Sequence, residues 1–226
     1  RGLKVIEDSC ETMFMDGVGT GDVACFSFYI AHLLITGVGG MAITKDKKLA
    51  DLIRSLIFHG RDNQYLNIDD DDEPTKEIIE ARFRFNYPGY SSRGTEVEAA
   101  LGLVELESYK DMIKKRRENA RILGVCLYEN EPQMLEWFGA YQQNHAFMMF
   151  PYLCKNRDNL MMFMEKRGIT TRTLMPLLNQ PYINIKSIDF QVSHNLLKYG
   201  MLFGCHQGLG DKELERIIKT IEEFNA

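Results

Sequence analysis

The chain has 226 residues, of which 45% are hydrophobic, 26% charged and 11% aromatic, and its formal net charge at pH 7 is −5. This composition is typical of a globular protein, and it excludes a disordered tail, a collagen-like fibre and a coiled coil. The acidic balance gives no indication of a surface for nucleic acid or anionic membranes, because such surfaces carry a basic excess.

The sequence also indicates a compartment. No run of about 18 apolar residues is present, so no transmembrane helix is expected, and the N-terminal residues lack the layout of a secretory signal peptide. The five cysteines are widely spread and show no C-x-x-C spacing, which argues against a disulfide framework or a zinc site. We therefore expect a cytoplasmic protein that binds no metal, nucleic acid or membrane.

The first half of the chain alternates strand and helix patterns. Three strands are predicted, at residues 3–7 (buried and ending in acidic residues), 24–30 and 41–44. Apolar residues from Leu49 to Ile57 recur at helical spacing, and Gly60 would end this helix. The acidic residues 69–73 are interpreted as a solvated loop that leads into a helix at Pro74, because helix N-termini favour acidic residues.

The second half begins with a long helix. Thr95 to Glu98 form a capping box, which predicts a helix or helix pair from there to about Tyr128. The later pattern predicts a strand, a helix, a strand and a terminal helix, at residues 146–153, 160–166 and 169–174 and from an N-cap at Asp211. We therefore predict an α/β fold in two parts, with the break near residues 130–133.

Two groups of polar residues follow predicted strands. Glu7 and Asp8 stand at the carboxyl end of the first strand, where open α/β sheets bind ligands. Ser27 ends the second, and His32 and a glycine-rich segment at 36–41 follow it. A hydroxyl beside backbone N–H groups suits a phosphate, and a histidine suits proton transfer. Taken one at a time, a structural role is the better interpretation of each residue.

Taken together, these residues resemble the DegT/DnrJ sugar aminotransferases, pyridoxal phosphate (PLP) enzymes of fold type I that act on nucleotide-linked keto sugars. The matching segments are, in order, 5–11, 21–29, 36–41, 89–102, 116–120 and 168–172. The resemblance implies that residues 1–130 are part of a large cofactor-binding domain with a long connecting helix, and that 131–226 are a small C-terminal α/β domain. It also implies a homodimer, since the active sites of the family are shared between subunits.

The resemblance implies cofactor contacts for five residues. Asp8 would pair with the protonated pyridine nitrogen, Glu11 would reach the ring hydroxyl, and Ser27 would bind the phosphate. Ser91 stands where the family usually has an asparagine that reaches the cofactor phosphate of the neighbouring subunit, so this chain has the shorter side chain there. Arg93 matches a neighbouring active-site arginine.

His32 departs from the aminotransferase pattern. Those enzymes have a lysine five residues after the phosphate-binding serine, and it forms the Schiff base with PLP. An imidazole cannot form that bond, so the cofactor would be held non-covalently, although His32 still transfers protons near neutral pH. The change resembles a branch of sugar 3-dehydratases that use pyridoxamine phosphate (PMP). There the histidine removes a proton from the cofactor, and the 3-hydroxyl of a 4-keto sugar then leaves.

Three functions follow from the resemblance. The first is PMP-dependent 3-dehydration of a nucleotide-linked 4-keto sugar, with His32 as the acid/base. The second is a nucleotide-sugar aminotransferase with glutamate as amino donor. The third is an inactive or incomplete chain that only dimerises or binds a sugar nucleotide. No iron–sulfur cluster is expected, because the cysteines are not grouped. Family members carry a further N-terminal segment, so the chain is expected to belong to a longer protein of deoxysugar or lipopolysaccharide biosynthesis.

Overall fold

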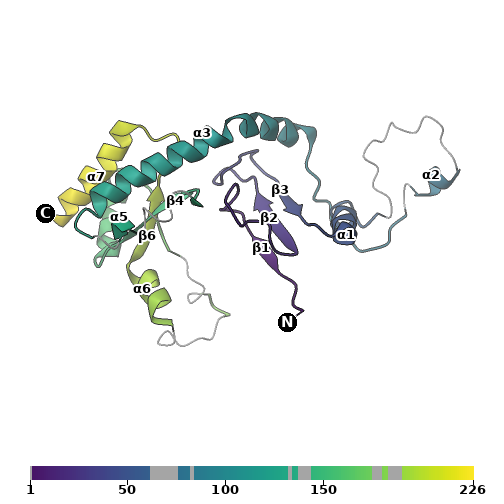
Figure 1. The fold of residues 1–226 in the computed structure, drawn as a ribbon, viewed down its shortest axis with the longest axis horizontal. Helices are drawn as coiled ribbons and strands as arrows, with labels where there is room; N and C mark the ends of the chain where they lie inside the picture. The colour runs from purple at the N-terminus through teal and green to yellow at the C-terminus, as the bar shows by residue number, and fades with distance from the viewer. Residues whose placement is uncertain are drawn as a thin grey trace. The chain divides into compact units, whose positions relative to one another are not determined.

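A computed structural model describes residues 2–61, 76–81, 84–131, 134–136, 144–174, 180–182 and 190–226 (Figure 1). They form two compact units, residues 1–107 and 108–226. The domain division expected after residue 130 stays a prediction. The predicted acidic loop at 69–73 and the helix start at Pro74 lie outside the described residues. Within those residues, no helix combines the length and the apolar character needed to cross a membrane.

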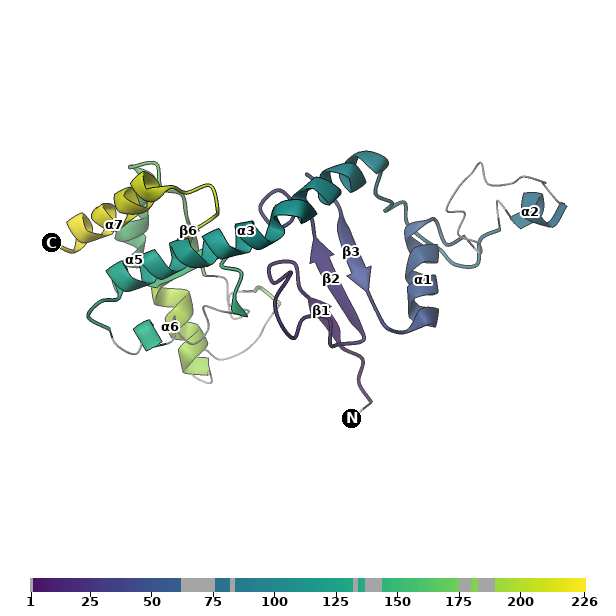
Figure 2. The ribbon, with the colours of Figure 1, turned by 45° about the horizontal axis from the view of Figure 1, so that its top comes forward.

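The first unit is built on a three-stranded mixed sheet in the order β1-β2-β3 (Figure 2). Its strands are β1 (Ile6–Asp8), β2 (Val23–Ser27) and β3 (Gly40–Ile43). The central strand β2 pairs in parallel with β1 and antiparallel with β3. Helix α1 (Lys47–Ile57) lies on the β3 side of the sheet, and the short helix α2 (Lys76–Ala81) follows it in the chain.

The core of this unit lies on β2 and on the segment after it. Ala24 is 1% exposed and Leu33 is 1% exposed, whereas Ile6 on β1 is 73% exposed. The prediction that the first strand is buried is therefore wrong. The physical reason is that β1 is an edge strand among the described residues, and it pairs with β2 on one side only.

A carboxylate closes the long connection between β1 and β2. Glu7 accepts hydrogen bonds from the main-chain N–H of Gly19, at 2.7 Å, and of Gly21, and from the hydroxyl of Thr20 at 3.2 Å. The N–H groups of Gly19 and Gly21 lower the pKa of Glu7. These loop N–H groups do not pair with a strand of the sheet. The Glu7 carboxylate provides the hydrogen-bond acceptors that a neighbouring strand would otherwise provide.

Helix α1 begins and ends as its sequence indicates. Asp46 is the N-cap, and its carboxylate accepts from the main-chain N–H of Lys48 at 2.9 Å and of Leu49 at 3.3 Å. After the helix, Gly60 has a φ of +80°, and a Cβ there would lie 1.8 Å from the carbonyl oxygen of Tyr87. Only glycine fits, because the chain at residues 84–93 crosses the end of the helix at contact distance.

Helix α3 (Glu96–Leu127) starts in the first unit and continues into the second. The predicted capping box is present, since the Thr95 N–H donates to the Glu98 carboxylate at 2.7 Å and the Val97 N–H donates to the Thr95 hydroxyl at 3.3 Å. Further along, Gly102 packs against the segment after β2, where a Cβ would meet the methyl group of Thr36 at 3.3 Å.

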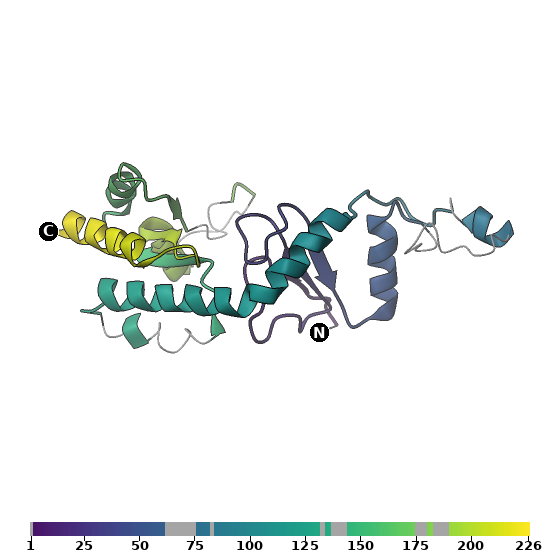
Figure 3. The same ribbon diagram turned by 90° about the horizontal axis from the view of Figure 1, so that it is seen from above.

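The second unit has a three-stranded antiparallel sheet in the order β4-β6-β5. Its elements are β4 (Met149–Leu153), α5 (Arg157–Glu165), β5 (Thr171–Thr173), α6 (Gln191–Tyr199), β6 (Gly200–Gly204) and α7 (Asp211–Asn225). Helix α7 lies along the C-terminal half of α3, where Ile122 lines one groove together with Leu214 and Ile218 (Figure 3).

Two features of this unit differ from the sequence prediction. Helix α6 and strand β6 were not predicted from the sequence, although β6 is the central strand. The sequence of β6 is bounded by glycines and has no β-branched residue, so it carries little strand signal. The N-cap of α7 is Gly210 and not Asp211, and the Gly210 N–H donates to the Glu213 carboxylate at 2.9 Å.

Buried polar side chains of α3 hold the loops around this second sheet. Arg116 is 3% exposed, and its guanidinium donates to the carbonyl oxygens of Phe147 at 3.3 Å and Met148 at 3.2 Å and to the Gln207 side chain at 2.9 Å. Asn119 donates to the carbonyl oxygen of His206 at 2.9 Å. The buried charge of Arg116 is thus met by oxygen acceptors, as a guanidinium requires.

We predict that Glu7→Gln lowers the melting temperature (Tm) at pH 7 and reduces its dependence on pH. The pKa of Glu7 is lower in the folded chain than in the unfolded chain, whose value is near 4.5. The carboxylate therefore stabilises the fold above that value, and the contribution is lost as the pH falls through the folded pKa. Thermal melts at pH 7 and pH 3 test this, with Glu107→Gln on the exposed surface of α3 as control. Equal Tm losses at both pH values would contradict it.

We predict that Tyr128→Phe lowers the free energy of unfolding by about 1–2 kcal/mol, the cost of losing both hydrogen bonds of a buried hydroxyl. Tyr128 is 2% exposed, and its hydroxyl donates to the Pro151 carbonyl and accepts from the Leu153 N–H, both at 3.3 Å. Urea unfolding followed by circular dichroism measures the change. Tyr182→Phe, at a tyrosine that is 74% exposed, is the matched control. An equal effect of the two variants would refute the prediction.

Candidate functional site

Two predicted site residues end neighbouring parallel strands. Asp8 is the last residue of β1, and Ser27 is the last residue of β2. The register places Asp8 beside Cys25, two residues before Ser27. Because side chains alternate along a strand, Asp8, Cys25 and Ser27 share one face of the sheet. The structure therefore brings the two predicted residues together at the carboxyl edge, where α/β sheets bind ligands.

The Asp8 carboxylate is kept in its charged form. Its Oδ1 accepts a hydrogen bond from the Cys10 main-chain N–H at 3.3 Å. Hydrogen bonds from the thiol and the N–H of Cys10 are the largest causes that lower the pKa of Asp8, and partial burial acts in the opposite direction. At neutral pH this carboxylate is an acceptor for a protonated ring nitrogen or another cationic donor.

Ser27 and His32 lie on one turn at the end of β2. The Tyr29 N–H donates to the Ser27 hydroxyl oxygen at 3.2 Å, which leaves the hydroxyl hydrogen available for an anion. The His32 N–H donates to the Tyr29 carbonyl at 2.9 Å, and the two rings meet edge to face with centroids 5.9 Å apart. Hydrogen bonds from the N–H groups of Tyr29 and His32 thus order the turn that carries the imidazole, and the ring of Tyr29 contacts it.

The imidazole of His32 has an unsatisfied atom. Its Nδ1 is buried, and it has no hydrogen-bond partner among the described residues. Leaving a buried polar atom without a partner is costly, and such atoms in folded proteins call for an explanation. A ligand bound at the end of β2 would provide such a partner.

Glu11 lies on the same loop as Asp8, three residues further along, and its side chain is exposed. Its carboxylate has no hydrogen-bond partner within the part of the chain that the structure describes. The loop therefore carries a second carboxylate near Asp8, available to a ligand that enters from solvent.

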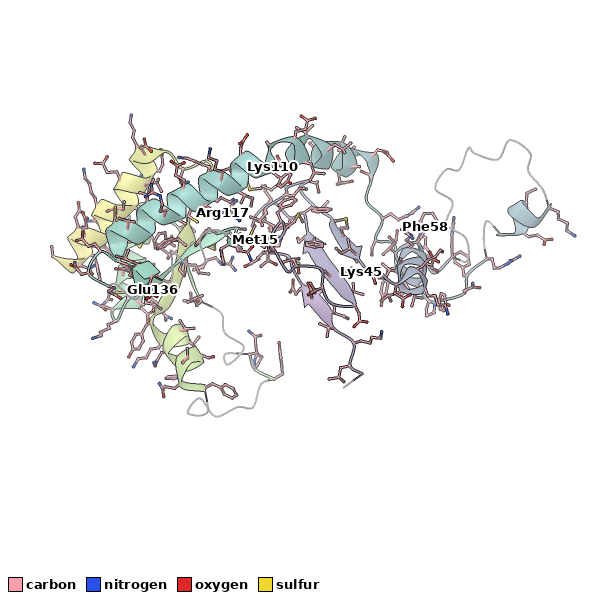
Figure 4. The ribbon with its side chains drawn as sticks, viewed as in Figure 1. Met15, Lys45, Phe58, Lys110, Arg117 and Glu136 are labelled. Atoms are coloured by element: carbon pink, nitrogen blue, oxygen red, sulfur yellow. The ribbon has the colours of Figure 1, made fainter. Side chains whose placement is uncertain are left out.

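Ser91 and Arg93 form a separate group, at the C-terminal end of α1. Ser91 forms a backbone bridge with Phe58, which Figure 4 labels. The guanidinium groups of Arg93 and Arg61 lie 4.3 and 4.8 Å from the centroid of the Phe58 ring. Among the described residues, no hydrogen bond or ion pair links Ser91 or Arg93 to the Asp8 group. Two cationic groups therefore meet on one aromatic ring, and the backbone of that residue pairs with Ser91.

The sequence analysis gave no role to Cys10 or Arg61. Cys10 stands two residues after Asp8. An aspartate side chain often accepts a hydrogen bond from the N–H two residues further along, so this contact could have been predicted from the spacing. Arg61 reaches Phe58 only because the chain turns at Gly60, and no local pattern reports the stacking of Arg93 on the same ring.

Comparison with known proteins gives consistent matches along the chain. The model of the DegT/DnrJ/EryC1/StrS aminotransferase family matches residues 1–222. The chain is 28% identical to the lipopolysaccharide biosynthesis protein RfbH of Salmonella typhimurium, covering 98% of this chain and 56% of that protein. It is 27% identical to the GDP-perosamine synthase of Caulobacter vibrioides, covering 99% of this chain and 59% of that protein.

A solved structure shows the same fold. It is the E. coli GDP-4-keto-6-deoxy-D-mannose-3-dehydratase with bound hydrated PLP, which matches with a TM-score of 0.74 and 21% identity over 97% of this chain and 60% of that chain. The chain thus spans less than two thirds of the length of these relatives. The match confirms the predicted α/β fold as part of the type I PLP-dependent transferase fold. The chain belongs to the DegT/DnrJ/EryC1/StrS aminotransferase family.

Proposed function

We propose that this chain, in its whole protein, carries out PMP-dependent 3-dehydration of a nucleotide-linked 4-keto sugar. The observation that carries the proposal is the buried Nδ1 of His32, which has no partner among the described residues. His32 stands five residues after Ser27, where the aminotransferases have their lysine. One protein of solved structure with the same fold is a GDP-4-keto-6-deoxy-D-mannose-3-dehydratase. The proposal also places the protein in deoxysugar or lipopolysaccharide biosynthesis, in the cytoplasm.

The residues at the sheet edge fit PLP or PMP bound non-covalently. When bound, such a cofactor supplies a conjugated ring that withdraws electrons from a carbon attached to its nitrogen. The charged Asp8 carboxylate would hold the protonated ring nitrogen, the Ser27 hydroxyl would donate to the phosphate, and Glu11 would accept from the ring hydroxyl. The depressed pKa of Asp8 and the free hydrogen of Ser27 support these assignments.

His32 would act as acid and base. Its Nδ1 is buried and has no partner in the described part of the chain, so it is available to take up a proton and to return it to the departing 3-hydroxyl. An imidazole cannot make the covalent bond that a lysine makes at this position. The turn at Tyr29 holds the ring while the proton moves.

Ser91 and Arg93 would bind the cofactor phosphate of a second copy of the protein. The Arg93 guanidinium on the Phe58 ring supports an anion at this place, because an aromatic ring attracts a cation but does not neutralise its charge. A homodimer follows from this assignment, with each subunit supplying Ser91 and Arg93 to the site of its partner.

The second candidate function is an aminotransferase that uses glutamate as amino donor. It is favoured by the identity with a protein named GDP-perosamine synthase. In that case His32 would move the proton without ever holding PLP. The third candidate is a chain that only dimerises or binds a sugar nucleotide.

We predict that the whole protein, incubated with PMP and a GDP- or dTDP-linked 4-keto-6-deoxy sugar, forms a 3-deoxy sugar. Mass spectrometry of the nucleotide-sugar product measures the outcome. An amino sugar, formed when glutamate is supplied, would reject dehydration and assign the aminotransferase. If no product forms and the absorbance spectrum of PMP does not change, both enzymatic functions are rejected. The third candidate, a chain that only dimerises or binds a sugar nucleotide, then remains.

We predict that His32→Asn lowers the rate of product formation by at least about 100-fold while PMP still binds, because proton transfer by a side chain contributes about that factor. We expect His32→Lys to give a variant that retains PLP after borohydride reduction and denaturation. The wild-type protein, treated in parallel, should lose its PLP. Retention by the wild-type protein would contradict non-covalent binding.

A further inference from the structure

We propose that Phe58 is a positioning residue, whose aromatic ring orders the Arg93 guanidinium before an anion binds to it. The importance of this contact for the cofactor phosphate rests on the proposed function of Arg93. The contact between the two side chains does not rest on it, and each part has its own measurement below.

The backbone fixes Phe58 relative to Arg93. Phe58 and Ser91 form an antiparallel bridge, and beside it the Tyr90 N–H donates to the Leu56 carbonyl at 2.6 Å. Arg93 stands two residues after Ser91. In an antiparallel pair, a long side chain reaches the diagonal neighbour on the opposite segment. The pairing therefore brings the Arg93 side chain within reach of the Phe58 ring.

The turn after α1 also restrains Phe58. Its N–H donates to the Ser55 carbonyl at 3.0 Å, at the C-terminal end of the helix. The next residue, His59, has a φ of +63°, which is uncommon for a residue with a side chain, and its N–H donates to the Tyr90 carbonyl at 2.7 Å. Such a conformation persists only where the surrounding structure maintains it. The turn that carries Phe58 is therefore firmly held.

The contact with Arg93 is direct. The Arg93 guanidinium lies over the Phe58 ring, 4.3 Å from its centroid. Arg93 is exposed, and within the described ranges its side chain forms no hydrogen bond or ion pair. An exposed arginine samples many rotamers, and ordering it for a ligand costs conformational entropy at the moment of binding. The ring restricts those rotamers in advance.

An aromatic ring suits this purpose better than a carboxylate. A carboxylate beside Arg93 would form an ion pair and compete with an anionic ligand for the same N–H donors. A ring attracts the cation without neutralising it, and a guanidinium over a ring keeps the N–H donors in its own plane for a ligand. The side chain is therefore ordered while its charge and its donors stay available.

Arg61 depends less on Phe58 than Arg93 does. Its guanidinium lies 4.8 Å from the centroid of the Phe58 ring, and it also lies 5.9 Å from the centroid of the Phe85 ring. Arg61 therefore keeps an aromatic neighbour when Phe58 is changed. Among the described residues, Phe58 is the one ring over which Arg93 lies. A change at Phe58 should thus act mainly through Arg93.

The first experiment needs neither cofactor nor substrate. The rate of modification by phenylglyoxal is measured for each arginine of the whole protein by peptide mass spectrometry. In Phe58→Leu, Arg93 should react about two- to fivefold faster than in the wild type, the factor that corresponds to an exposed cation–π contact. Phe58→Tyr, which keeps the ring, should preserve the slow rate. Arg121, exposed on α3, should react equally in all three proteins. Unchanged rates at both arginines in Phe58→Leu would overturn the proposal.

The second experiment measures the affinity for PMP by absorbance titration of the whole protein. Phenylalanines with one, two or three fluorine atoms on the ring are introduced at position 58. Each fluorine weakens the attraction of the ring for a cation and nearly conserves its size, so a purely structural role would not respond. PMP affinity should fall stepwise, by about two- to fivefold in total. The matched control is Phe85→Leu, at a ring that contacts Arg61, and it should bind PMP like the wild type.

The outcomes separate the two roles. If Arg93→Gln weakens PMP binding while the fluorinated proteins bind like the wild type, the positioning role of Phe58 is wrong and the function of Arg93 stands. An equal loss of affinity in Phe85→Leu would also overturn the positioning role. If Arg93→Gln binds PMP normally, the proposed function of Arg93 fails, whatever the modification rates show.

Discussion

The parallel pairing of β1 with β2 is the constraint on which the candidate site depends. It puts Asp8 beside Cys25 and on the same face as Ser27, at the edge where both strands end. A slip of one residue in this register would turn Asp8 to the other face of the sheet and replace it with Glu7. The turn that carries His32 starts from Ser27, so its position follows from the same pairing.

In both units, a long polar side chain forms hydrogen bonds with backbone groups of loops that do not pair with the sheet. In the first unit the Glu7 carboxylate accepts from loop N–H groups, and in the second the Arg116 guanidinium donates to loop carbonyl groups. The two side chains have opposite charge because the backbone groups that they bind have opposite polarity. Each loop is thereby fixed by a residue that lies in regular secondary structure, and the positions of neighbouring residues follow from it.

Features that depend on neighbouring residues could be predicted from the sequence. Contacts between segments far apart in the chain could not. The capping box at Thr95 and the helix after Asp46 depend on residues within one turn, and both form. The grouping of Asp8 with Ser27 was predictable because strand ends share an edge. Strand β6 was missed because its place is decided by the two strands that flank it. The stacking of Arg61 and Arg93 on Phe58 joins segments separated by about thirty residues, which no periodicity reports.

The crossing at the end of α1 links two positions that are far apart in the chain. A Cβ at Gly60 would lie 1.8 Å from the carbonyl oxygen of Tyr87, and a Cβ at Gly89 would lie 2.1 Å from the nitrogen of Gly60. Neither glycine carries a group that binds a ligand, yet a methyl group at either would push the two segments apart and carry Ser91 and Arg93 with them. In natural variation, these two glycines should therefore be as resistant to change as the residues that perform the chemistry.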